Sequence, residues 1–290
     1  MSTLDTPRVR TAPAPAPVRK VTAEEILRGT QGFTRIQNAG GMGALLVTSF
    51  RLALTPPFSW WKGAIVDGSL MLRRCIMPLL VSSSVFVVGF GFFVLGGITE
   101  VLGASDREGG AVIIGLLREM AIWLTGMIFA GVAGSAIAAD LGARKVREEL
   151  DALSVLGVDK TRVLVVPKVM AATLICPVLG FVSILGIEVV NFALAPSQFG
   201  WSPGVLFASS LGSLTAPDIW GALIRYLIIG AMVGVVGCYK GLTCDAGTEG
   251  VGRAVNQTIV ITFFGVWMLD AFFNLAYLSL FPEAQVSFKG

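Results

Sequence analysis

Five long apolar segments stand out along the 290 residues of the chain. A transmembrane helix needs about 20 mostly apolar residues, because each residue adds about 1.5 Å and the hydrocarbon layer of a bilayer is about 30 Å thick. The segments that meet this requirement are residues 77–102, 111–139, 163–192, 217–239 and 256–281. The pattern therefore predicts an all-α integral membrane protein whose five transmembrane helices lie in residues 77–281.

The residues before the first of these segments have a different pattern. Residues 1–21 are rich in alanine and proline, which predicts a disordered tail. Over residues 22–76, apolar side chains recur at helical spacing among basic ones, and the aromatic-basic cluster at 58–62 is typical of the lipid headgroup level. We therefore predict amphipathic helices on the membrane surface. The alternative, a short span over residues 40–56, is disfavoured by its length and by Arg51.

Composition agrees with a bilayer as the solvent. Hydrophobic residues make up 54% of the chain and charged residues only 14%, against about 25% in an ordinary soluble domain. The chain has no histidine, which excludes histidine-dependent catalytic triads and histidine-ligated metal sites. A net charge of +3 does not suggest a nucleic-acid partner. The four cysteines form no CxxC pair and are expected to be buried or lipid-facing thiols.

The basic residues predict the orientation. The segment up to residue 74 and the loops 140–162 and 240–255 together hold 17 lysines and arginines, whereas the loops 103–110 and 193–216 and the C-terminal tail hold two. Because lysine and arginine collect on the cytoplasmic side of a membrane, this asymmetry predicts a cytoplasmic N-terminus and an outer tail over residues 282–290. We therefore expect a multi-pass protein of the cell (inner or plasma) membrane.

The loop between the second and third spans has a helical pattern of its own. No residue from 143 to 156 breaks a helix, and Gly157 is suited to end one. Val146, Leu150 and Leu153 have the spacing of one apolar stripe on a helix. Periodicity alone leaves two interpretations open. The helix could be a contact that a soluble partner moves, or it could be a connector that rests on the membrane.

Two long motifs in this part of the chain resemble a known family. The segment from Asp140 to Pro167, with EELDAL at 148–153, and the segment from Gly237 to Asn256, with GVG at 250–252, are similar to the signatures of the MlaE/YrbE permeases. These permeases are the membrane subunits of ABC lipid transporters that work with MCE-domain proteins. The second motif most resembles the actinobacterial YrbE A-type subunit, which pairs with a B-type subunit, although 244–245 and 248–249 depart from the common pattern.

The resemblance implies a coupling helix and a set of partners. Residues 143–156 would dock in a groove of a cytoplasmic ABC ATPase. The implied partners are that ATPase, a paralogous B-type permease subunit or a second copy of this chain, an assembly of MCE-domain proteins, and a lipid. The residues expected at the ATPase contact are Arg147, Glu148, Glu149, Leu150, Asp151 and Leu153, of which the two leucines would form an apolar plug.

The sequence contains no nucleotide-binding motif. GxxxxGK[ST] is absent, so ATP and Mg²⁺ are expected in the partner ATPase, and this chain is predicted to bind no cofactor or metal and to hold no catalytic residue. The glycines at 247, 250 and 252 are expected to form a tight turn with positive φ before the last span.

Charged residues within the spans predict a polar cluster in the outer half of the bilayer. Its expected members are Arg118, Glu188, Arg225 and Asp270, paired as Arg118 with Glu188 and Arg225 with Asp270. The cluster would either line the mouth of a translocation cavity or hold helices together without touching substrate. Lys168, near an inner helix end, is expected to extend its ammonium group toward the membrane surface.

Small and aromatic residues in the spans suggest contact surfaces. The patterns Gly126-xxx-Ala130-xxx-Gly134 and Gly230-xxx-Gly234 predict close helix packing, either within the chain or between subunits. The resemblance implies that the first and last spans meet across a dimer and line a lipid cavity. The candidate lipid contacts are therefore Phe86, Phe90, Phe93, Phe264 and Trp267, with ordinary lipid-facing side chains as the alternative.

Together these features favour one function. The chain is predicted to be the permease subunit of an ATP-driven lipid importer, which forms a hydrophobic cavity as a dimer and couples to a separate ATPase. The alternative is an ion- or proton-coupled secondary transporter of a hydrophobic substrate, which typically shows inverted repeats that this sequence lacks. A membrane enzyme is disfavoured because the carboxylates are scattered and histidine is absent.

Overall fold

The computed structural model describes residues 31–56, 58–103, 108–200 and 202–280. The expected tails 1–21 and 282–290 lie outside these residues. The chain divides into two units, residues 1–41 and 42–290, and the second contains all five candidate spans of the described residues. Throughout the described ranges the regular structure is helical, which confirms the all-α prediction.

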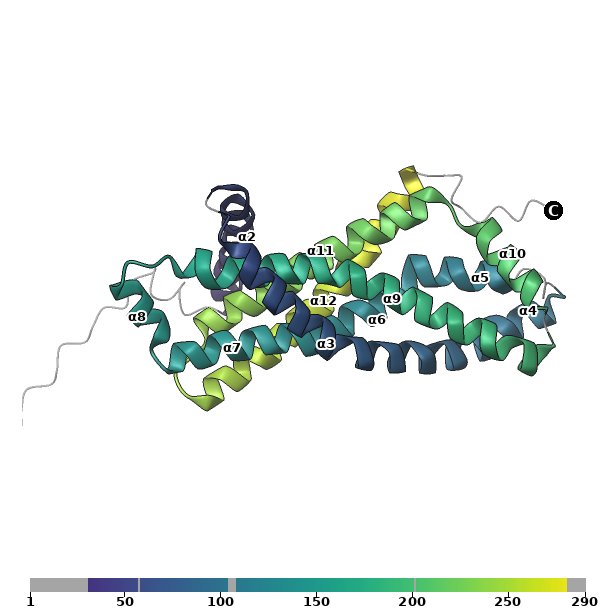
Figure 1. The fold of residues 1–290 in the computed structure, drawn as a ribbon, viewed down its shortest axis with the longest axis horizontal. Helices are drawn as coiled ribbons and strands as arrows, with labels where there is room; N and C mark the ends of the chain where they lie inside the picture. Colours follow the sequence, from purple (N-terminus) through teal and green to yellow (C-terminus); the bar gives the residue numbers. More distant parts are fainter. Residues whose placement is uncertain (1–30, 57, 104–107, 201, 281–290) are drawn as a thin grey trace, which may run out of the picture. The chain divides into compact units, whose positions relative to one another are not determined.

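The helices follow one another with short connections (Figure 1). Some of the long helices contain π-helical segments, labelled η. The elements are α2 (Gln31–Leu54), α3 (Trp60–Phe86), η1 (Val87–Gly96), α4 (Gly97–Val101), α5 (Glu108–Gly115), η3 (Leu116–Met120), α6 (Ala121–Phe129), η4 (Ala130–Gly134), α7 (Ser135–Val146), α8 (Glu149–Val155), η5 (Thr161–Val165), α9 (Val166–Phe199), α10 (Pro203–Ser213), α11 (Ala216–Thr243) and α12 (Thr248–Leu280).

Five continuous helical runs are long and apolar enough to cross a membrane, as predicted. They are Trp60–Gly91, Gly109–Val146, Thr161–Ser197, Ala216–Thr243 and Thr248–Tyr277. These runs fit a multi-pass membrane protein. Figure 1 shows α8 and the α11–α12 turn at one end of the unit, which we call the α8 end, and α10 beside α5 at the other.

The first predicted span, which begins at residue 77, is the second part of a longer helix. α3 begins at Trp60 and continues without a break past that position. Its buried residues, Ala64, Gly68, Met71, Cys75 and Leu79, recur at helical spacing and form one stripe. α3 packs extensively against α9. The charged residues of this segment suggested a surface helix, but they lie beside the buried stripe of a helix that continues into the span.

The small-residue patterns are internal contacts of this chain. A Cβ atom at Gly234 of α11 would lie 3.0 Å from the Cα atom of Val169 in α9. Across the next interface, a Cβ atom at Gly126 would lie 3.0 Å from the side chain of Val266, and one at Gly134 would lie 3.0 Å from that of Val233. Larger side chains would therefore push α9, α11 and α12 apart. The four cysteines are free and buried, as expected.

The turn between α11 and α12 partly matches its prediction. Gly247 has a φ of +88°, which a side chain would disfavour. Gly250 instead lies within α12, where a Cβ atom would collide with the backbone carbonyl of Asp245. Gly252 is an ordinary helical residue with open space around it. Positive φ is thus confirmed for Gly247 and was wrongly expected for the other two glycines.

Candidate functional site

Charged side chains from different helices form two separate networks. The first lies away from the α8 end and joins α6, α11 and α12. Arg225 of α11 forms an ion pair with Asp270 of α12, with 2.8 Å between Nη1 and Oδ1. The other carboxylate oxygen of Asp270 accepts a hydrogen bond of 2.7 Å from the indole nitrogen of Trp123. The Arg225–Asp270 pair agrees with the pairing expected from sequence.

Further contacts extend this pair into a network. Nη1 of Arg225 also donates to the backbone carbonyl of Arg118, and its guanidinium lies 4.5 Å from the ring centre of Phe273. Asn274 donates a hydrogen bond of 2.6 Å to Glu119. Because these buried polar groups have partners, the network can exist within an apolar environment.

Arg118 pairs with Asp218 and not, as predicted, with Glu188. Its Nε atom lies 2.9 Å from Oδ1 of Asp218, and the same carboxylate accepts hydrogen bonds from Thr215 and Tyr277. The prediction failed because Asp218, in the first turn of α11, lies on the same face of the helix as Arg225 two turns later, and this face is the one that contacts Arg118. We call the whole set the outer network, after the half of the bilayer in which the sequence predicts it. Its members are Arg118, Glu119, Trp123, Thr215, Asp218, Arg225, Asp270, Asn274 and Tyr277.

Glu188 is not part of this network. It lies in α9, is buried, and neither carboxylate oxygen has a hydrogen-bond partner among the described residues. Asn191, one turn further along α9, is likewise buried without a described partner for its side-chain amide. Glu188 was expected to pair with Arg118 in the polar cluster, and the structure does not bring these two side chains together.

Three network members on α12 share a detectable signal, although sequence analysis selected only one of them. Asp270, Asn274 and Tyr277 are spaced four and three residues apart and therefore lie on one face of α12. Asn274 and Tyr277 carry no charge, so a search for charges within apolar segments missed them. A search for any polar residue on the face that contains Asp270 would have found both.

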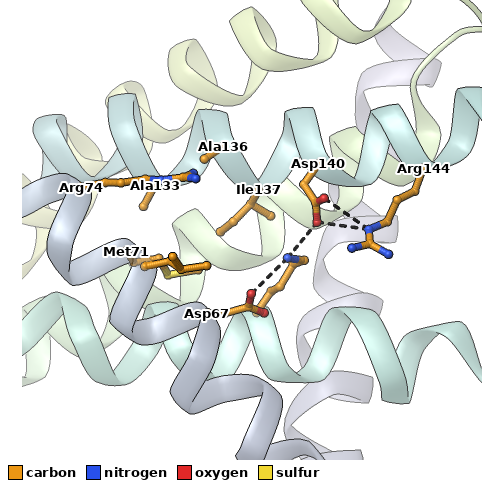
Figure 2. A pocket seen from close by; sticks show the side chains of 10 residues that line it. Asp67, Met71, Arg74, Ala133, Ala136, Ile137, Asp140 and Arg144 are labelled. Atoms are coloured by element: carbon orange, nitrogen blue, oxygen red, sulfur yellow. Dashed lines mark hydrogen bonds and ion pairs between the residues drawn. The ribbon is translucent and has the colours of Figure 1, made fainter.

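The second network lies at the α8 end and is centred on Lys168 of α9. Its Nζ atom lies 3.0 Å from Asp140 of α7 and 3.5 Å from Asp67 of α3, and Asp140 also contacts Arg144 (Figure 2). The expectation that Lys168 extends to the membrane surface is therefore wrong, since the side chain is only 12% exposed and bridges two carboxylates. We call Asp67, Lys168, Asp140 and Arg144 the Lys168 chain.

The predicted single helix over residues 143–156 is broken in the middle. α7 ends at Val146, and Glu148 takes a left-handed conformation with φ of +60° before α8 begins at Glu149. The turn lets the Glu149 carboxylate contact both Arg144, at 3.4 Å, and Arg147, at 2.8 Å. Two ion pairs to one carboxylate and the burial of Leu150 accompany the break, and neither is visible in helical periodicity.

The break changes which residues of this loop are accessible. Leu150, expected to form an apolar plug, is only 5% exposed, and Leu153 is half-buried. Val155 and Leu156 are instead 89% and 75% exposed. The charged residues expected beside the leucines remain accessible, since Arg147, Glu148 and Asp151 are exposed and Glu149 is half-buried.

Gly157 ends α8 as predicted. Its φ is +69°, its N–H donates to the Ser154 carbonyl, and the N–H of Val158 donates to the Leu153 carbonyl. These paired bonds satisfy carbonyls at the helix end.

The aromatic candidates differ in exposure. Phe86 and Phe90 are half-buried and stacked with 5.4 Å between ring centres. Phe264 and Trp267 of α12 are exposed, and Trp267 also stacks on Trp123 of the outer network. The side chain of Phe93 lies outside the described residues. Of the five spans, those in α3 and α12 have the least buried surface.

Comparison with known proteins identifies the family. Residues 73–276 match the family described as Permease MlaE. The chain is 31% identical over 172 residues to a probable ABC transporter permease protein of Synechocystis, covering 59% of this chain and 65% of that protein. It is also 31% identical over 169 residues to the chloroplastic protein Trigalactosyldiacylglycerol 1 of Arabidopsis thaliana, covering 58% and 48% respectively.

A third relative, a probable ABC transporter permease protein of Rickettsia bellii, is 29% identical over 178 residues, covering 59% of this chain and 68% of that protein. The chain thus spans about half to two thirds of the length of these curated relatives. The family match runs from α3 to α12 and includes both polar networks except Asp67 and Tyr277. This multi-pass membrane protein belongs to the MlaE permease family.

Proposed function

We propose that this chain is the permease subunit of an ATP-driven lipid importer. The observation that carries the proposal is the match to the MlaE permease family over residues 73–276, which includes α8 and most of the spanning helices. Several relatives are named ABC transporter permease proteins, and such a permease works with a separate ATPase. A lipid as the substrate is supported by the Arabidopsis relative, whose name is that of a galactolipid.

The exposed faces of α3 and α12 support a dimer with a lipid cavity. These two helices have the least buried surface among the spans, and α12 presents Phe264 and Trp267 to its surroundings. In the proposed assembly the two helices meet their counterparts in a B-type paralogue or a second copy of this chain. Phe86, Phe90 and Phe93 would then contribute to the apolar cavity. An assembly of MCE-domain proteins would deliver lipid from the outside.

The segment around α8 is the proposed contact with the ATPase. Val155 and Leu156 supply exposed apolar surface, and Arg147, Glu148 and Asp151 supply charges beside it. In this proposal Val155 and Leu156 take the role that the sequence suggested for Leu150. The basic residues of this loop and of the N-terminal segment support a cytoplasmic position for it, with the C-terminus outside.

A continuous series of ion pairs connects this contact to the spans. Glu149 at the start of α8 contacts Arg144, and Arg144 contacts Asp140, which belongs to the Lys168 chain. The series of ion pairs ends at Asp67 in α3. We propose that movement of α8 upon ATP binding by the partner is transmitted along these ion pairs to α9 and α3, because side chains held by charged contacts move with their partners.

Purification from the native membrane tests the proposal. The full chain, isolated in mild detergent from its own cell, is expected to bring an ABC ATPase with it. Val155→Asp, which places a charge on the exposed apolar surface, is expected to reduce the recovered ATPase at least tenfold. Val101→Asp is the matched control, because Val101 is as exposed as Val155 but ends α4 at the other end of the unit. Equal recovery of the ATPase with wild type and Val155→Asp would contradict the proposed contact.

Transport distinguishes the proposal from its alternative. Lipid uptake into vesicles that hold the purified complex is expected to require ATP hydrolysis. Uptake driven by an ion or proton gradient in the absence of ATP would identify a secondary transporter and overturn the proposal.

A further inference from the structure

A pocket between α3 and α7 lies at the α8 end and is separate from the outer network. Its volume is about 260 Å³ (Figure 2). This is slightly less than the volume of pockets that enclose a small organic molecule, which begin at about 300 Å³. The pocket therefore fits a compact chemical group and not a whole lipid.

The charged lining of the pocket is unbalanced. Three cationic side chains, Arg74, Arg144 and Lys168, face two carboxylates, Asp67 and Asp140. Both carboxylates are already in contact with Lys168, and Asp140 also contacts Arg144. The carboxylates thus have partners, and the pocket keeps an excess positive charge.

Arg74 is the cation of this lining that has no carboxylate. Within the part of the chain that the structure describes, its guanidinium makes no hydrogen bond or ion pair. Figure 2 shows its side chain extending toward Ala133 of η4, the segment just before α7. Its five N–H donors are therefore available to an oxyanion, which arginine binds through two parallel hydrogen bonds.

The position of Arg74 points to a ligand that belongs to the membrane. Arg74 lies seven residues after Asp67 on α3, about 10 Å deeper along a helix that forms a span. The wall between these two residues is apolar and includes Leu70, Met71 and Ile137. On the same helix, Val66 and Met77 are exposed and would face lipid in a bilayer. A ligand in this place meets both positive charge and an apolar wall.

We propose that the pocket binds the phosphate group of a membrane lipid, with Arg74 as the principal ligand and Lys168 and Arg144 contributing positive charge. The apolar wall contacts the glycerol and the first carbons of the acyl chains. The site is distinct from the proposed transport cavity and requires neither the ATPase nor a second permease subunit. A positive or negative result for lipid binding at this site therefore does not decide the proposed transport function, which is tested separately.

Native mass spectrometry of the purified full chain in detergent tests the site with three probes. These are a phosphatidic acid, the diacylglycerol with the same acyl chains, and inorganic phosphate. We expect phosphatidic acid to bind at least tenfold more tightly than diacylglycerol, because only the former carries the phosphate. Equal binding of the two lipids would overturn the proposal. Displacement of phosphatidic acid by millimolar inorganic phosphate would show a site for free anions and would also overturn it.

Two neighbouring arginines provide a matched comparison. Arg74→Gln is expected to weaken phosphatidic acid binding about tenfold, whereas Arg73→Gln is expected to leave it unchanged, since Arg73 is exposed on the same helix but does not line the pocket. Arg74→Lys keeps the charge without the paired donors and should give an intermediate affinity. Equal losses in Arg73→Gln and Arg74→Gln would indicate general attraction to the basic surface and would contradict a specific site.

Discussion

Arg225 and Asp270 form an ion pair that is almost completely removed from solvent, with side chains that are 1% and 3% exposed and 2.8 Å between Nη1 and Oδ1. The pair joins α11 to α12 in the middle of the outer network. Charges this deeply buried are tolerated only when both have partners. The contact therefore holds two spans in one relative position, whatever its further relation to substrate.

Removal of one partner from this pair is expected to be costly. Asp270→Leu leaves the Arg225 guanidinium buried without its carboxylate, and we expect a loss of about 3–5 kcal/mol in the free energy of unfolding. The double variant Arg225→Met with Asp270→Leu should lose less than Asp270→Leu alone, because no uncompensated charge remains. Unfolding in detergent by denaturant titration measures both. Additive losses would show that the two residues do not interact.

Glu188 is expected to behave differently from Asp218. Since neither carboxylate oxygen of Glu188 has a described partner, Glu188→Gln should leave the denaturation temperature unchanged or raise it. Asp218→Asn should lower it by several degrees, because it removes the charge opposite Arg118. Thermal unfolding followed by tryptophan fluorescence compares the two variants. A large loss for Glu188→Gln would mean that Glu188 has a stabilising partner in the native assembly.

Lys168 is expected to stabilise the fold through its two ion pairs. Lys168→Met should reduce the free energy of unfolding by about 1–3 kcal/mol, because Asp67 and Asp140 both lose their shared cation. Lys62→Met is the control, since Lys62 is exposed and forms no ion pair with a described residue. If Lys168 merely extended to the membrane surface, the two variants would have similar stability.

The left-handed residue between α7 and α8 gives a prediction about the backbone. Glu148 has a φ of +60°, a conformation that costs about 1–2 kcal/mol for residues other than glycine. Glu148→Gly should therefore be neutral or stabilising, whereas Glu148→Val should destabilise the loop because a β-branched residue fits this region poorly. Protease sensitivity of the loop in the purified protein provides the measurement. Greater cleavage of Glu148→Gly than of Glu148→Val would contradict the assigned conformation.

Several features that depend on a short stretch of chain were predictable from the residues alone, although the break at Glu148 was not. Five candidate spans follow from the lengths of the apolar segments. Each transmembrane helix must form its own backbone hydrogen bonds and must be long enough to cross the bilayer by itself. The end of α8 at Gly157 and the positive φ of Gly247 follow equally from local backbone preferences. Family membership also required only motifs that are continuous in the chain.

The partners of the charged residues could be known only once the helices were packed together. Arg118 and Asp218 are 100 residues apart, and helical periodicity gives no sign that they are in contact. They meet because α11 lies beside η3. Lys168 contacts α3 and α7 for the same reason, and the early start of α3 follows from its packing on α9. Hydropathy measures how each segment partitions between water and lipid, but the energy of a buried charge depends on which other helix supplies its counter-charge.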